Sequence, residues 1–111
     1  MTNVRPAFHP GMTWTPEAAA SFISQYDREV TEAMTQLQVR LLTEHPHGSV
    51  FVHRYTADAI CRYNCTRLGT AGQAMGYVEV RLQTGECYSG IVLVRWEDGT
   101  VVISENPATP A

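Results

Sequence analysis

The chain has 111 residues, of which 44% are hydrophobic and 17% charged, and its formal net charge is −3. It has the size of one ordinary domain and enough apolar residues for one core, which excludes a disordered chain or a charged tail. All eight basic residues are arginines, which also excludes a Schiff base through lysine and a standard P-loop.

The arginines are spread along the chain, whereas a nucleic-acid binder normally carries a basic stripe and a positive net charge. We therefore expect no binding of nucleic acid. The densest apolar run, residues 91–94, is far shorter than the roughly 18 residues that cross a membrane. The first 14 residues contain two prolines and no apolar core segment, so neither a membrane span nor a signal peptide is expected.

A long helix is predicted over residues 16–44. Thr15 is a good N-cap, Pro16 suits the first helical position, and Glu17 faces the positive end of the helix dipole. The segment 45–48, His-Pro-His-Gly, ends the pattern. The apolar stripe of this helix consists of Phe22, Tyr26, Val30, Ala33, Leu37 and Leu41. Glu29 and Glu32 are assigned to its solvated face.

This helix is long for its domain. About 29 residues extend about 43 Å, whereas a compact chain of this length is roughly 35 Å across. The helix must therefore bend, end early, or project past its own core. A projecting apolar end would need a partner, and this is the reason to expect a homodimer.

Shorter elements follow. Residues 49–55 predict a strand, and Thr56 can cap a second helix that runs to about Leu68 and stops at Gly69. The glycine-containing segment 69–76 is interpreted as a flexible connection.

The remaining residues predict a meander whose first turn decides its register. A two-residue turn would place the apolar residues of the two strands on opposite faces. A three-residue turn over 83–85, with Gly85 left-handed, instead pairs Val80 with Tyr88. One face then consists of Val78, Val80, Leu82, Tyr88, Val92, Val94 and Trp96.

A second turn is predicted as a two-residue type I′ turn at Asp98–Gly99, which adds Val101 and Ile103 to the same face. The fold class is thus α+β in the order α-β-α-β-β-β, with the long helix on a mostly antiparallel sheet of about four strands and a short second helix. We expect an irregular arm over 1–14, held by Phe8, Met12 and Trp14, a single domain over 15–104, and a loose tail over 105–111.

Three cysteines are the main candidates for chemistry. Cys61 and Cys65 are four apart on one side of the second helix, too far apart for an unstrained disulfide, and we interpret them as structural. A zinc site that takes further ligands from Cys87, His53 or the pair His45 and His47 is a weaker alternative, because a helical cysteine pair with scattered histidines is not a strong zinc signature. A nucleophile–base pair of Cys87 and His53 has no local support. Reduced thiols indicate a cytoplasmic protein.

The opposite face of the meander is half polar, with an apolar centre at Ile91 and Leu93. One interpretation is that the second helix covers this centre through Ile60 and Leu68. The other is a contact with a partner protein, because tyrosine, arginine and aliphatic residues are common at interfaces. The expected interface consists of Tyr77, Glu79, Arg81, Ile91, Leu93 and Arg95.

No pattern of catalytic residues, metal ligands or cofactor contacts stands out, so the sequence favours a non-enzymatic protein. We expect a small cytosolic protein that acts by protein–protein interaction, as an inhibitor, adaptor or accessory factor, with phage and bacterial origins among the options. The architecture resembles cystatin-like and NTF2-like folds, and this resemblance implies an alternative: a ligand binder or enzyme with a pocket between helix and sheet. That pocket would be lined by Tyr26, His53, Tyr88 and Trp96.

Overall fold

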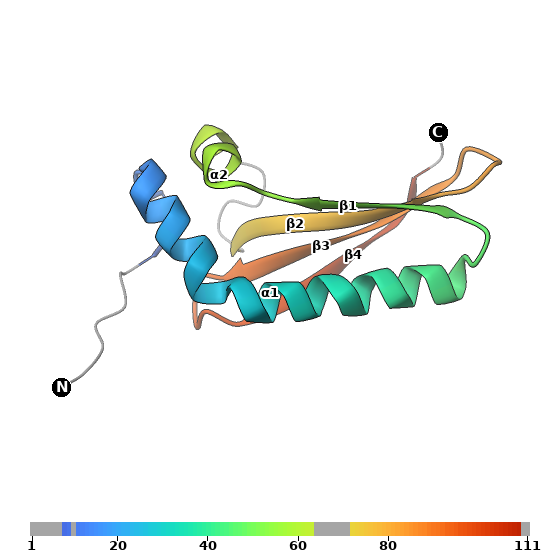
Figure 1. Ribbon diagram of the computed structural model, residues 1–111, viewed down its shortest axis with the longest axis horizontal. Coiled ribbons are helices and arrows are strands. Elements are labelled where there is room, and N and C mark those ends of the chain that lie inside the picture. The colour runs from blue at the N-terminus through green and yellow to red at the C-terminus, as the bar shows by residue number, and fades with distance from the viewer. Residues whose placement is uncertain (1–7, 10, 64–71, 110–111) are drawn as a thin grey trace.

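The computed structural model describes residues 8–9, 11–63 and 72–109. Its elements are α1 (Pro16–Glu44), β1 (Ser49–Arg54), α2 (Ala57–Tyr63), β2 (Gly72–Arg81), β3 (Cys87–Arg95) and β4 (Val101–Thr109). The strands form one antiparallel sheet in the order β1-β2-β3-β4, and α1 lies along one face of it (Figure 1). The predicted α+β fold and its element order are confirmed.

The long helix begins and ends where its capping residues predict. Thr15 Oγ1 accepts a hydrogen bond from the backbone N–H of Ala18 at 3.1 Å, and Pro16 lies in the first turn. At the other end, the N–H of His45 donates to the carbonyl of Leu41 at 2.9 Å. Every residue of the predicted apolar stripe is buried, so the stripe contributes to the core along the helix.

Of the three ways in which the long helix α1 could fit a small domain, the structure shows that it bends (Figure 1). Figure 1 shows that the N-terminal part of α1 runs in a different direction from the rest and turns over the end of the sheet. The molecule is elongated, with principal extents of 52 × 26 × 21 Å. Because residues from Ala19 to Leu41 are buried along the helix, no bare apolar end projects. The original reason for expecting a homodimer therefore no longer holds.

The first hairpin has the predicted three-residue turn. Gly85 is left-handed with φ of 92°, and the N–H of Leu82 donates to the carbonyl of Glu86 at 2.9 Å. Val80 lies opposite Tyr88, as expected. The helix-facing side of β2 and β3 is therefore the predicted one, and it includes the buried residues Val78, Val80, Val92 and Val94.

The second hairpin differs from the prediction. A two-residue turn at Asp98–Gly99 would pair Glu97 with Thr100, but the N–H of Arg95 donates to the carbonyl of Thr100 at 2.9 Å, which leaves a four-residue loop over 96–99. The register therefore differs by two residues, and an even shift keeps each side chain on its face. Val101 accordingly lies opposite Val94 on the helix side. The expected face is correct although the expected turn is wrong.

Two segments expected to be irregular belong to the sheet. β2 begins at Gly72, so residues 72–76 are strand and not a flexible connection. A Cβ on Gly72 would overlap the carbonyl oxygen of Val94, and one on Gly76 that of His53, so the glycines permit close strand approach beside an irregularity between Ala74 and Gly76. β4 continues through Thr109, so the prediction of a loose tail is wrong for residues 105–109.

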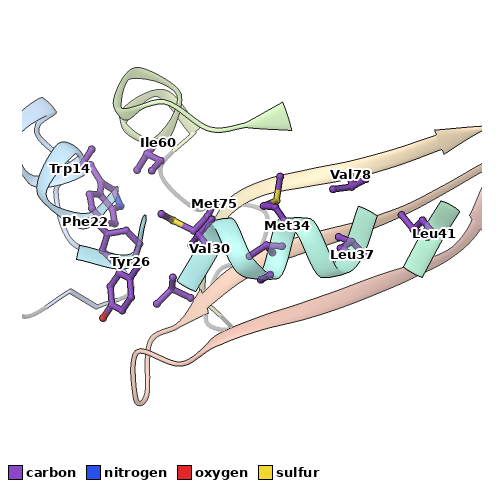
Figure 2. Close-up of a cluster of buried hydrophobic side chains, with 14 of the residues drawn as sticks. Trp14, Phe22, Tyr26, Val30, Met34, Leu37, Leu41, Ile60, Met75 and Val78 are labelled. Atoms are coloured by element: carbon purple, nitrogen blue, oxygen red, sulfur yellow. The ribbon is translucent and has the colours of Figure 1, made fainter. Parts of the chain in front are cut away.

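The second helix packs on α1 and not on the outer sheet face. Ile60 is fully buried in one cluster with Trp14, Phe22 and Met75, at the end of the core shown in Figure 2. The interpretation that Ile60 covers the outer face is therefore wrong. The predicted end of this helix at Leu68 and Gly69 falls within residues 64–71, which lie outside the described part of the chain, as does Cys65.

The N-terminal arm is anchored as predicted where it is described. Trp14 is buried, and Phe8 and Met12 pack against the core. The rings of Phe8 and Trp14 are stacked, and both contact Phe22 edge-on. This aromatic group closes the end of the core under the bent part of α1.

Candidate functional site

The sheet face opposite α1 carries the predicted interface residues. Tyr77 lies opposite Ile91, and Glu79 and Arg81 alternate with buried valines on β2. Leu93 shares this face, but it is only 5% exposed and is therefore largely unavailable to a partner. Arg95 is exposed at the end of β3. Five of the six predicted residues thus have some exposure on one face.

Strand β1 extends this face with residues that the sequence-based interface omitted. Phe51 lies opposite Glu79, and His53 lies opposite Tyr77. Phe51 is 41% exposed, one of three large hydrophobic side chains that are exposed in the described part of the chain. Alternate residues of the segment 49–54 lie on the same side of the strand, but the sequence does not say which side is the outer one. The pairing of β1 with β2 decides this. We define the open face as Phe51, His53, Tyr77, Glu79, Arg81 and Ile91.

Side-chain contacts organise the open face. The rings of His53 and Tyr77 are stacked with their centroids 4.4 Å apart. The Arg81 guanidinium lies 5.0 Å from the centre of the Phe51 ring and forms an ion pair with Glu79. The hydrogen bond to Glu79 raises the pKa of Arg81. The face therefore presents aromatic rings with a fixed cation and anion beside them.

Cys87 lies next to this group, and its surroundings do not favour the thiolate that a nucleophile requires. Burial raises the pKa of its thiol, and the Glu79 carboxylate raises it further, so the neutral thiol dominates at neutral pH. Cys87 lies opposite Arg81, whereas His53 lies opposite Tyr77. These positions are about 13 Å apart along β2. The sequence pair of Cys87 and His53 is therefore not brought together.

The alternative pocket is not assembled either. Tyr26 and Trp96 belong to the aromatic end of the core, where both contact Phe22. Tyr88 stacks on His45, with centroids 3.7 Å apart, and its hydroxyl donates to Glu86. His53 lies on the opposite side of the sheet. The four residues therefore occupy three separate places, and buried side chains fill the space between α1 and the sheet (Figure 2).

Other expected features can be placed as well. Cys61 is free, partly buried and packed against the core, in agreement with a structural role, whereas Cys65 lies outside the described residues. Within the described ranges, no three His, Cys, Asp or Glu side chains gather in a way that could hold a metal ion. Among the described helices, none is long and apolar enough to cross a membrane.

A groove lies on the β4 side of α1, where the sequence suggested only a solvated helix face. Its volume is about 470 Å³, and it runs between α1 and the β3–β4 loop. Tyr26 is the one member of the expected pocket that lines it. The lining consists of Gln25, Tyr26, Glu29, Glu32, Ala33, Gln36, Gly99, Thr100 and Val101.

The chain matches no protein-family model, no curated protein and no solved structure. A function can therefore be proposed only from the geometry and chemistry of these two surfaces.

Proposed function

We propose that this is a small non-enzymatic protein that acts in the cytoplasm by binding another protein, as an inhibitor, adaptor or accessory factor. The observation that carries the proposal is the open face, on which the exposed ring of Phe51 lies with the partly exposed side chains of Tyr77 and Ile91 beside a core that is already filled. Tyr77 and Arg81 are of the types that contribute most at interfaces, and phenylalanines such as Phe51 are enriched there. The free thiols of Cys61 and Cys87 support a reducing compartment.

A double variant on the open face tests this proposal. Phe51→Ser with Arg81→Glu removes the exposed ring and reverses the charge beside it. Both side chains are exposed, so we expect the variant to fold, with circular dichroism and thermal unfolding close to wild type. We expect it to lose the proteins that wild-type chain captures from its native host, as measured by affinity capture with quantitative mass spectrometry.

The matched control makes the same two changes on the solvent side of α1. Val39 is 59% exposed and Arg28 is also exposed, so Val39→Ser with Arg28→Glu has the same chemistry away from the open face. This control should capture the same proteins as wild type. If both variants capture them equally, the open face is not the binding surface.

Self-association is proposed on a different observation, the contrast between the two sheet edges. β4 is blunted by Pro107, which has no N–H to donate, and by an irregular register with β3. β1 has neither a proline nor an acidic residue, and Val52 is 46% exposed beside Phe51. An unprotected apolar edge of this kind readily pairs with another strand.

A second copy fits this edge through a two-fold axis. If Val52 of one copy lies opposite Val52 of the other, Phe51 of each faces His53 of the other, and Arg54 faces Val50. In this arrangement the two-fold axis passes between the two Val52 residues, so the two open faces lie on the same side of a continuous sheet. No like charges lie opposite each other. Self-association would thereby join two open faces into one wider surface.

Light scattering after size exclusion tests the edge. Wild-type protein should have twice the 12.3 kDa mass of one chain. Val52→Lys places a charge on the edge and should yield a monomer, whereas Val39→Lys, with the same change on α1, should remain a dimer. A wild-type monomer at all concentrations, or a dimeric Val52→Lys, would contradict β1 pairing.

A further inference from the structure

The groove beside α1 is elongated. It follows α1 from Gln25 to Gln36, and at about 1.5 Å per residue this stretch is about 16 Å long. Gly99, Thr100 and Val101 form its opposite wall. A long and open trough of this kind suits an extended chain better than a compact ring.

A fixed hydroxyl reaches this groove. Tyr26 is only 9% exposed, and its ring contacts Phe22 with centroids 5.0 Å apart. Its hydroxyl lies beside Gly99, where an added Cβ would come within 2.7 Å of Oη, and Figure 2 shows it pointing away from the core. Among the described residues, no hydrogen bond reaches it. The hydroxyl is therefore held in place and is available to a ligand.

The charge of the groove has one sign. Glu29 and Glu32 line it, and no arginine does. Arg28, beside the groove, lies 3.9 Å from Glu32 with both side chains largely exposed, a pair of little strength. The amide oxygens of Gln25 and Gln36 add further acceptors at the two ends. The groove thus offers acceptors along its length and a negative centre.

We infer that this groove binds the ammonium groups of an extended linear polyamine. An ammonium group has three donors and no acceptor, which matches two carboxylates and a hydroxyl. Side chains three apart on a helix are neighbours, so one ammonium can reach both Glu29 and Glu32. A second amine of the same polyamine would reach the side-chain oxygen of Gln25 or Gln36 at one end of the groove. This inference does not rest on the open face.

Titration with spermidine, followed by amide NMR shifts, tests the inference. We expect saturable binding with shifts confined to residues 25–36 and 99–101. Glu29→Gln with Glu32→Gln should weaken binding at least about tenfold, which corresponds to about 1.4 kcal/mol. Tyr26→Phe, which removes only the hydroxyl, should weaken it about threefold. Arg28→Gln should strengthen binding, because it frees Glu32.

The control removes two carboxylates elsewhere on the same helix. Glu17→Gln with Glu44→Gln changes the net charge equally, lies outside the groove, and should leave the affinity unchanged within about twofold. If this control loses as much affinity for spermidine, or if the NMR shifts spread over all acidic residues, the binding is general attraction of a cation to an acidic protein. Either result would contradict a site in the groove. Equal affinity for N-acetyl-lysine amide would overturn the polyamine assignment, because one ammonium would then suffice.

Discussion

Replacement of Phe22 by alanine should lower the free energy of unfolding by about 3–5 kcal/mol. Phe22 is 1% exposed, and its ring centroid lies 4.6 Å from that of Phe8, 5.3 Å from Trp14 and 6.0 Å from Trp96. Alanine would remove these ring contacts and leave a cavity that the surrounding rings cannot fill without moving. Urea unfolding followed by circular dichroism measures the difference.

The loss is large relative to the whole, because a domain of this size is stable by about 5–15 kcal/mol. Val39→Ala on the exposed side of α1 is the control, and it should change the free energy by less than about 0.5 kcal/mol. A loss below about 1.5 kcal/mol for Phe22→Ala would mean that the aromatic group does not close the core as a unit.

Gly76→Ala should destabilise the sheet by about 2–3 kcal/mol although it adds a single methyl group. The new Cβ would overlap the backbone carbonyl oxygen of His53 on the neighbouring strand. A main-chain atom cannot rotate away, so β1 and β2 would have to separate locally. Thermal unfolding should show the loss of stability, and the rate of amide exchange should increase most, relative to wild type, in β1 and β2.

Gly90 provides the comparison, because the obstacle there is a side chain. A Cβ on Gly90 would lie 2.6 Å from Cδ1 of Leu37. Leu37→Val should therefore recover part of the stability lost in Gly90→Ala, whereas His53→Ala should recover none of that lost in Gly76→Ala. Recovery of Gly76→Ala by His53→Ala would show that the side chain and not the main chain sets the limit.

The open face and the groove were visible in the sequence to different degrees. Alternation on β2 and β3 was enough to place Tyr77, Glu79 and Arg81 on one face, because side-chain direction in a strand follows from position alone. Phe51 was missed because its face depends on how β1 pairs with β2. The groove was missed because Glu29 and Glu32 face a loop some seventy residues away in the chain, and no local pattern records that contact.

The sequence by itself determined the long helix, its caps, its buried stripe and the three-residue turn at Gly85. These features depend on interactions between residues a few positions apart, which propensity and periodicity report directly. Only the tertiary structure decided that residues 72–76 and 105–109 are strands, that Ile60 enters the core, and that Leu93 is buried. Each of these depends on which distant backbone or side chain lies alongside, and a neighbour supplied by the fold overrides the weak local preference of glycine and proline segments.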